Sequence, residues 1–277
     1  MIVISRKLKK IIPYKTIFFP DEERLGPITS ALRPIEMARL FYTPVSGENV
    51  RRLVSHQPTP TILNDLLLSR DELMKRCAKY TRHEIQLAQK LGERVRIERN
   101  GENASQLFLE VYNDFARSKD GVWPVSEAVI RNYAPYADIV VVHLDEQPAV
   151  VNLLLRDREA ARVRGMLTAS RRLSVDDKKA YRLLGNVNRL MHWGNMCFYK
   201  DSGFEIYDWG GISGDKDDGI AKFKLSFGGE IVRENTYLCA GSPRFGKLIL
   251  TLFENLSKRG RYGRAAAESR ASKLKAA

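Results

Sequence analysis

Apolar residues follow two different patterns along this chain, and the change comes near residue 61. Before that point, seven prolines interrupt short apolar stretches, at positions 13, 20, 27, 34, 44, 58 and 60. Proline fixes its own φ and lacks a backbone N–H, so no long helix fits this region. The first 60 residues therefore predict short strands and turns.

From residue 61 onward, the apolar positions predict a regular series of elements. Residues 62–68 indicate a strand, and Ser69 with Glu72 forms a capping box that opens a helix ending at Gly92. The later predictions are a strand over 95–98, helices from 103 and over 126–136, strands over 138–144, 149–156 and 160–169, a helix over 174–200, a strand over 204–208, a short helix over 219–227, a strand over 230–237 and a helix from 243. The β-branched and leucine-rich runs of 138–169 favour buried antiparallel strands. We predict an α/β (α+β) fold: a mixed, largely antiparallel sheet flanked by helices.

Positive charge is the compositional feature that most affects the functional interpretation. The 277 residues carry a formal net charge of +13. Residues 1–20 contain five basic side chains and no acid, and the residues after Leu256 contain seven against Glu268 alone. This charge favours polyanionic partners, namely tRNA, a nucleotide-linked sugar or an anionic membrane face contacted through the basic ends. A soluble basic protein without such a partner is the alternative.

Metal, disulfide and membrane-spanning signals are weak in this sequence. Cys77, Cys197 and Cys239 are widely spaced, which predicts reduced thiols. The four histidines lack metal-ligand spacing, and Asp215–Gly219 lacks the alternating ligands of a calcium loop, so we predict no metal and a mobile loop. The apolar runs are too short to cross a bilayer. We expect a soluble, cytoplasmic protein that could also act at the inner face of the membrane.

Two neighbouring motifs carry the strongest candidate chemistry. Tyr207–Ile212 (YDWGGI) indicates a strand that ends in a glycine-opened loop, where a ligand has room to approach. Phe223–Gly229 (FKLSFGG) indicates one helical turn that presents Lys224 and stops at a double glycine. A lysine at such a place can neutralise a phosphate or support a developing oxyanion. The structural alternatives are a core strand with a glycine turn and a surface lysine on an amphipathic turn.

These motifs resemble the YDxGG-I and FKxxFGG signature of Fem-type (FemABX) aminoacyl/peptidyl transferases, a branch of the GNAT superfamily that builds peptidoglycan cross-bridges. The resemblance covers about residues 61–240 and implies a GNAT-like acyltransferase. It implies that Lys224 is catalytic and holds a phosphate or oxyanion. The other implied site residues are Asp208, as acceptor of the amine proton, and the substrate-binding residues Tyr207, Trp209, Gly210, Gly211 and Phe223.

A basic helix is a further candidate for binding phosphate. Lys79–Lys90 resembles the family's K-x-T-R-x-x-I-x-x-A-x-K helix. Lys79, Arg82 and Lys90 would give it a positive rim. A solvated basic face is the alternative.

Arg171, Arg172 and Tyr181 form the last candidate set, at the entry to the helix predicted from Ser174. In ordinary GNAT acetyltransferases this turn carries glycines, and its backbone amides hold the coenzyme A pyrophosphate. Residues 170–177 contain no glycine. This favours aminoacyl-tRNA over acyl-CoA as the donor, and we expect either donor as a co-substrate, with no tightly bound cofactor.

The resemblance also implies a domain organisation and a biological role. We expect a truncated N-terminal GNAT-like half over residues 1–94, the acyltransferase domain over 95–257 and a basic, disordered tail over 258–277. The implied function is transfer of an aminoacyl or other acyl group to an amine of a peptidoglycan precursor or envelope amino sugar, with a nucleotide- or lipid-linked sugar as acceptor. The alternatives are a CoA-dependent sugar N-acetyltransferase and a non-catalytic GNAT-like module that binds tRNA or anionic membrane.

Overall fold

The computed structural model describes residues 1–8, 11–44, 47, 50–212 and 218–252. Their contacts divide the chain into two compact units. Unit 1 comprises Met1–Ile2 and Thr59–Glu234, and unit 2 comprises Val3–Pro58 with the described residues from Asn235 onward. The tail predicted over 258–277 lies outside the described residues.

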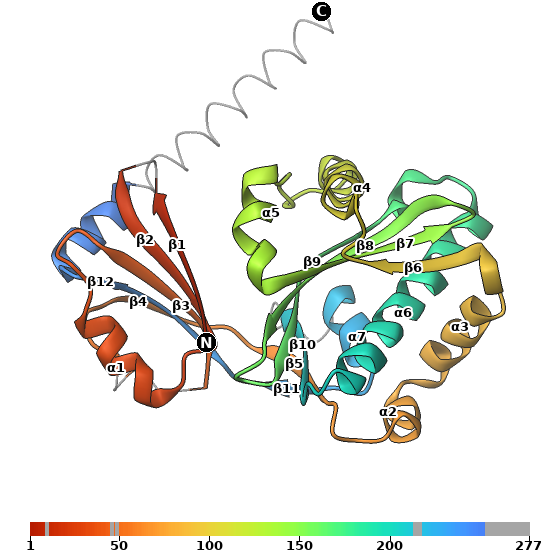
Figure 1. The fold of residues 1–277 in the computed structure, drawn as a ribbon, viewed down its shortest axis with the longest axis horizontal. Helices are drawn as coiled ribbons and strands as arrows, with labels where there is room; N and C mark the ends of the chain where they lie inside the picture. The colour runs from red at the N-terminus through yellow and green to blue at the C-terminus, as the bar shows by residue number, and fades with distance from the viewer. Residues whose placement is uncertain (9–10, 45–46, 48–49, 213–217, 253–277) are drawn as a thin grey trace, which may run out of the picture. The chain divides into compact units, whose positions relative to one another are not determined.

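Unit 1 is built on a seven-stranded sheet (Figure 1). In spatial order its strands are β11 (Glu230–Val232), β5 (Thr61–Asp65), β10 (Ile206–Gly211), β9 (Arg162–Ser170), β8 (Gln147–Asp157), β7 (Ala137–Leu144) and β6 (Val95–Arg99). Neighbouring strands are antiparallel, except that β10 is parallel to β9. The predicted fold class, a largely antiparallel sheet with flanking helices, is confirmed.

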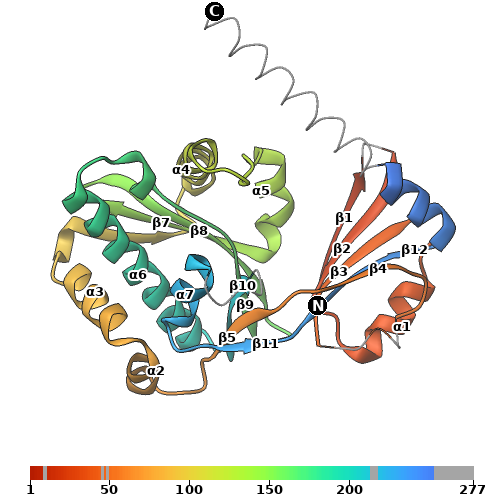
Figure 2. The same cartoon turned by 180° about the vertical axis from the view of Figure 1, so that it is seen from behind.

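Helices cover both faces of this sheet (Figures 1 and 2). One face carries α4 (Ala104–Ser118) and α5 (Glu127–Tyr133), and the other carries α2 (Arg70–Arg76), α3 (Lys79–Gln89), α6 (Lys178–Asp201) and α7 (Gly219–Leu225). In β8, Val151 packs in the α4 core and Val150 in the α6 core. Because both faces are covered, residues 149–155 of β8 are apolar on both faces except at Asn152 and do not alternate with polar residues.

The domain boundary that the sequence places at residue 94 differs from the division by contacts. β5, α2 and α3 precede residue 94 but belong to unit 1. The reason is that β5 pairs with both β10 and β11, so it lies inside the sheet of unit 1.

Three predicted elements have different limits in the structure. The helix expected from Ser69 to Gly92 is two helices, α2 and α3, because Cys77 and Ala78 have extended backbone between them. The strand expected over 230–237 is two strands in different sheets, β11 and β12 (Asn235–Ala240). The long helix begins at Lys178 with Asp177 as its cap, and residues 171–174 form a separate 3-10 turn, η4 (Arg171–Ser174).

Unit 2 contains a five-stranded sheet. In spatial order its strands are β1 (Ile2–Leu8), β2 (Ile12–Phe18), β3 (Met37–Thr43), β12 and β4 (Leu53–Pro58). β12 is antiparallel to both β3 and β4, whereas β2 and β3 are parallel. Its helices are α1 (Glu22–Ser30), which the sequence does not predict, and residues 243–252, which follow the predicted start at Pro243.

Candidate active site

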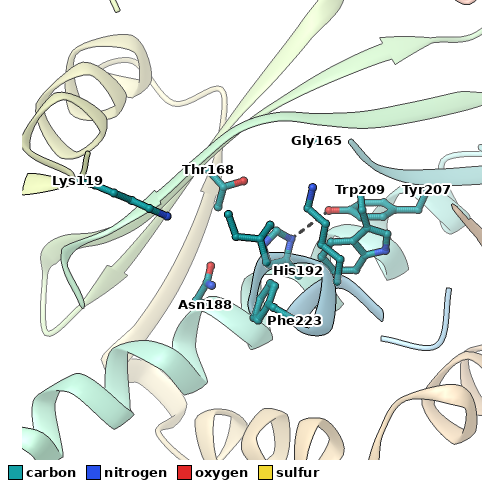
Figure 3. A pocket seen from close by; sticks show the side chains of 10 residues that line it. Lys119, Gly165, Thr168, Asn188, His192, Tyr207, Trp209 and Phe223 are labelled. Carbon is teal, nitrogen blue, oxygen red and sulfur yellow. Dashed lines mark hydrogen bonds between the residues drawn. The ribbon is translucent and has the colours of Figure 1, made fainter. Parts of the chain in front are cut away.

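A cavity of about 190 Å³ lies in unit 1 beside the parallel strand pair β9 and β10 (Figure 3). The two strands pair only where Arg162–Arg164 of β9 lie beside Ile206–Asp208 of β10. After Arg164, β9 continues to Ser170 without pairing to β10. The cavity is bordered by the two strands, by α6 and by α7. Its lining residues are Lys119, Gly165, Thr168, Asn188, His192, Tyr207, Trp209, Ile220, Phe223 and Lys224.

Four aromatic rings form one wall of this cavity. His192 on α6 lies 4.8 Å from the Trp209 ring and 5.6 Å from the Phe223 ring, measured between centroids. Tyr207 packs edge-on against Trp209 at 5.1 Å. The Trp209 indole donates a hydrogen bond to Asn64 Oδ1 at 2.6 Å, which fixes the ring. The wall is therefore rigid and apolar, and it suits the hydrocarbon chain of an acyl group or the side chain of an aminoacyl group.

His192 contributes a neutral imidazole to the aromatic wall. Burial lowers its pKa to about 3, and the nearby charges of Lys224 and Arg189 act in the same direction. Its Nδ1 lies 3.3 Å from the Tyr207 hydroxyl (Figure 3). At neutral pH the ring therefore offers one N–H donor and one acceptor, without a charge.

Lys224 brings an ammonium group to the same cavity. Its Nζ donates hydrogen bonds to the carbonyl oxygens of Gly211 at 2.8 Å and Gly210 at 3.3 Å. Burial and the neighbouring Arg164 charge lower its pKa to about 8, against the opposing effects of Asp208 and Asp218. Lys224 is thus largely protonated at neutral pH and is positioned by two backbone carbonyls.

Gly210 and Gly211 lie within β10 and not in a loop after it. A bulge separates Asp208 from Gly211 in the pairing with β5. Gly210 has a φ of +78°, which glycine adopts far more readily than other residues. The bulge turns both carbonyls toward Lys224.

Asp208 lies in a fully buried ion cluster. Its carboxylate accepts hydrogen bonds from Arg164 at 2.5 Å, Arg162 at 2.5 Å and Thr61 at 2.6 Å. Arg162 is also paired with Glu234. Burial raises the pKa of Asp208, but the two arginines outweigh it and hold the pKa below its usual value. Such a carboxylate is a weak base, so its contacts favour a structural role over the predicted acceptance of the amine proton.

A second cavity, of about 270 Å³, adjoins the first. Its lining residues are Phe115, Lys119, Thr168, Ala169, Ser170, Arg172, Leu173, Tyr181, Asn188, Gly219, Ile220 and Phe223. Five of these, Lys119, Thr168, Asn188, Ile220 and Phe223, also line the first cavity. We refer to the two adjoining cavities together as the groove; Lys224 lines the first part, and Arg172 and Tyr181 line the second.

The predicted residues Arg171 and Arg172 separate in the structure. Arg171 lines neither part of the groove, since its guanidinium binds Glu110 and the Pro148 carbonyl. Arg172 lines the groove and stacks on Tyr181, with 3.8 Å between its Cζ and the ring centroid.

The basic helix around Lys79 and Arg82 lies apart from this groove. Arg82 donates to the carbonyl oxygens of Cys77 and Lys75, so it closes the C-terminal end of α2. Lys79 is exposed at the start of α3. Neither residue lines the groove.

Four polar residues that line the first cavity are missing from the sequence-based set: Lys119, Thr168, Asn188 and His192. Of these four, only Asn188 and His192 on α6 could have been found from a sequence pattern. Asn188, His192 and Asn195 are spaced by four and three residues, which places polar side chains along one side of the helix. All three lie within a sequence whose other inward positions are apolar.

No group of three or more potential metal ligands occurs among the described residues. Asp215–Asp217 of the acidic loop lies outside them. All three cysteines are free. No described helix combines the length and apolar character needed to cross a membrane.

Comparisons with known proteins identify the fold. No protein-family model and no curated protein matches the sequence. The crystal structure of FemX matches 88% of this chain and 85% of its own, with 14% identity and a TM-score of 0.62. The C-terminal domain (DUF2156) of a protein described as a lysylphosphatidylglycerol synthetase, from Agrobacterium fabrum, matches 90% of this chain and 83% of its own, with 11% identity and a TM-score of 0.55. The chain therefore has a Fem/GNAT-like fold.

Proposed function

We propose that this protein is an acyltransferase whose reaction takes place beside Lys224. The observation that carries the proposal is the position of the Lys224 ammonium, fixed by the Gly210 and Gly211 carbonyls at the edge of an aromatic-walled cavity. A partly buried cation stabilises developing negative charge more strongly than an exposed one. The Fem/GNAT-like fold and the Fem-type motifs support the same reaction class.

The proposed reaction is direct transfer of an acyl group to an amine. The amine nitrogen attacks the carbonyl carbon of an activated ester, so that a C–N bond forms and the C–O (or C–S) bond breaks. Lys224 stabilises the carbonyl oxygen as it becomes negative, and the proton lost by the amine leaves with the departing oxygen or sulfur. The aromatic wall of His192, Trp209 and Phe223 orients the acyl group.

We further propose aminoacyl-tRNA as the donor, in preference to acyl-CoA. Support comes from η4, which has no glycine where coenzyme A-dependent acetyltransferases place theirs, and from the net charge of +13. The proposed acceptor is an amine on a nucleotide- or lipid-linked sugar of cell-envelope synthesis, including a peptidoglycan precursor. The proposed location is the cytoplasm, including the inner face of the membrane, which the basic ends of the chain could contact.

The test compares Lys224→Ala with Lys222→Ala, a matched loss of an exposed charge from the same short helix. Acyl transfer to amine acceptors is measured with a charged tRNA pool and with acetyl-CoA at fixed physiological salt. We expect kcat/KM to fall about 100-fold or more in Lys224→Ala and to stay near the wild-type value in Lys222→Ala. Full activity of Lys224→Ala would remove the proposal.

The donor and the alternative functions are separated by the same measurements. Saturable binding that depends on the aminoacyl group, without affinity for coenzyme A, supports the tRNA donor. Tight binding of coenzyme A points to a sugar N-acetyltransferase. Binding of tRNA or anionic vesicles that responds only to loss of the terminal basic residues, with no turnover, points to a non-catalytic module.

A further inference from the structure

The imidazole of His192 has one nitrogen bound inside the protein and one left for the cavity. Its Nδ1 lies 3.3 Å from the Tyr207 hydroxyl (Figure 3). Among the described residues, no group bonds to its Nε2, and the ring lines the first cavity. Trp209 and Phe223 pack against the ring, with centroids 4.8 and 5.6 Å away, so it is held in this orientation. The tautomer of His192 therefore decides whether Nε2 offers a proton or a lone pair to a substrate.

The direction of the bond between Tyr207 and His192 follows from Asn195, which lies on α6 three residues after the histidine. Asn195 is fully buried, and its Oδ1 accepts a hydrogen bond from Arg99 Nη2 at 2.8 Å. Arginine can only donate, so this contact fixes the carboxamide with Oδ1 toward Arg99 and Nδ2 away from it. Nδ2 is buried and makes no hydrogen bond of full geometry. The acceptor beside it is the Tyr207 hydroxyl: burial raises the pKa of this phenol, and the Arg99 charge and the Asn195 side chain act against it, as a hydrogen-bond donor does.

Arg99 is held in place by a second set of contacts. Its Nη1 donates a hydrogen bond to the Tyr199 hydroxyl at 2.9 Å, and Tyr199 in turn donates to Asp138 Oδ2 at 2.7 Å. An ionised carboxylate only accepts, so the Tyr199 proton points to Asp138 and the Tyr199 oxygen is left for Arg99. The guanidinium Cζ also lies 3.9 Å from the centroid of the Phe198 ring. The orientation of Arg99, and with it that of the Asn195 carboxamide, is therefore determined by groups outside the cavity.

We propose that this chain of hydrogen bonds makes His192 a neutral donor to the carbonyl oxygen of the acyl group. Arg99 donates to Asn195, and Asn195 donates to the Tyr207 oxygen. Tyr207 then donates to Nδ1 of His192, which leaves the proton of the ring on Nε2, at the cavity. The inference rests on the proposed function, because the oxygen concerned is the one that Lys224 stabilises. The proton stays on Nε2 throughout the reaction, so the imidazole serves as a hydrogen-bond donor and not as the base that accepts the amine proton.

A neutral donor suits a position next to Lys224. Both residues line the first cavity, and burial, followed by the Lys224 charge, lowers the pKa of His192 to about 3 and keeps the imidazole uncharged. A second cation would be repelled by the ammonium, whereas an N–H dipole adds to the stabilisation of an oxyanion without that repulsion. A neutral imidazole is an effective donor to a carbonyl oxygen when its surroundings prevent protonation. His192 is then a catalytic residue beside Lys224, and Arg99 and Asn195 are positioning residues.

The first test determines the tautomer without any assay of activity. The full chain is labelled with nitrogen-15 at histidine, and two-dimensional NMR correlates the ring nitrogens with the ring protons. Loss of a signal in His192→Gln assigns the resonances of His192. We expect the Nε2–H tautomer at pH 7 in wild type, and the same tautomer in Lys224→Ala, the variant designed to lose turnover. An Nδ1–H tautomer or an imidazolium in wild type would overturn the proposal, whatever the activity of the protein.

Asn195→Asp reverses the direction of the chain with little change of shape. The carboxylate accepts hydrogen bonds from both Arg99 and Tyr207, so Tyr207 no longer donates to His192. We expect the Nδ1–H tautomer, and a fall in kcat of about tenfold or more with the KM values little changed. Asn103→Asp adds the same charge at an exposed position before α4, and it should keep the wild-type tautomer and kcat. An Asn195→Asp variant that folds and keeps the tautomer and kcat of wild type contradicts the proposal.

Two substitutions at His192 separate a donor from a packing residue, and they remain informative if urea unfolding shows that Asn195→Asp does not fold. His192→Leu keeps an apolar side chain without a donor, and its kcat should fall about 100-fold. His192→Gln keeps an N–H donor and an acceptor for Tyr207, so its kcat should fall by about tenfold at most. Equal losses in the two variants would leave His192 a packing residue and overturn the proposal. Failure of the proposed function looks different: the Nε2–H tautomer would be present, but wild type would transfer no acyl group, and the role of His192 would fall with that function.

Discussion

Gly210 faces Gly165 so closely that a Cβ at position 210 would lie 2.8 Å from the Gly165 carbonyl oxygen. This approach occurs where β10 and β9 cease to pair, directly beside the cavity. The same glycine has its φ at +78°. Position 210 therefore requires glycine for two independent reasons, the contact with Gly165 and the positive φ.

Gly210→Ala should destabilise unit 1. The left-handed backbone alone costs about 1–2 kcal/mol for a residue with a Cβ, and the contact with Gly165 adds to it. We expect the free energy of unfolding in urea to fall by about 2 kcal/mol or more. Gly211→Ala is the control, because its Cβ would meet only the Pro60 carbonyl oxygen, at 3.9 Å. Equal stability of the two variants would contradict the described bulge.

Activity should fall as the pH rises through about 8. Lys224 has its pKa lowered to about 8, chiefly by burial, so its cation is present below that pH and lost above it. If the cation stabilises the oxyanion, the profile of kcat/KM against pH has a descending limb near 8. In Lys224→Arg, any remaining activity should persist to higher pH because guanidinium stays charged. A rate that rises through pH 8 would indicate that the neutral amine is the active form.

Stability should decline below pH 6.5 partly because of His192. Its pKa is about 3 in the folded protein, lowered by burial from 6.5. Between these values the unfolded chain binds a proton that the folded chain does not, so the free energy of unfolding rises with pH by up to about 1.4 kcal/mol per unit. Urea unfolding at pH 7.5 and 5 should show a smaller difference in His192→Gln than in wild type. If the free energy of unfolding changed equally with pH in both proteins, the pKa of His192 would be the same in the folded and the unfolded chain.

Loss of the Asp208 charge should destabilise the protein strongly. Asp208→Asn leaves Arg162 and Arg164 buried with a single remaining carboxylate, Glu234, and removing one member of a buried ion cluster costs about 3–5 kcal/mol. Asp145→Asn breaks a pair with Arg94 that lies in solvent, and its unfolding midpoint should stay near that of wild type. If Asp208→Asn folds normally but loses all turnover, Asp208 acts in the reaction after all.

The elements of unit 1 followed from the sequence wherever burial alone determined them. β7 and β8 carry mainly apolar side chains on both faces, so their positions came within a few residues of the prediction. The break between α2 and α3 at Cys77–Ala78 could not be predicted from the sequence. The apolar stripe continues across it, and the extended backbone there depends on the hydrogen bond that Arg82 donates to the Cys77 carbonyl.

The site was predictable only where its residues are neighbours in the chain. Tyr207, Trp209, Phe223 and Lys224 lie in two adjacent motifs and meet at one cavity. Lys119 and Thr168 come from separate elements without a motif of their own. The sequence could not predict that Arg171 binds Glu110 whereas Arg172 lines the groove, since Glu110 lies 61 residues away from Arg171 in the chain.

The position of β12 imposes an order on biosynthesis. β12 lies between β3 and β4, yet it follows all of the residues of unit 1 after Thr59 in the chain. As the ribosome extends the chain, residues 59–234 can complete their seven-stranded sheet before β12, the strand that pairs with both β3 and β4, has been synthesised. During that interval two strands of unit 2 have unpaired edges, which is the condition under which nascent chains recruit chaperones or associate with one another.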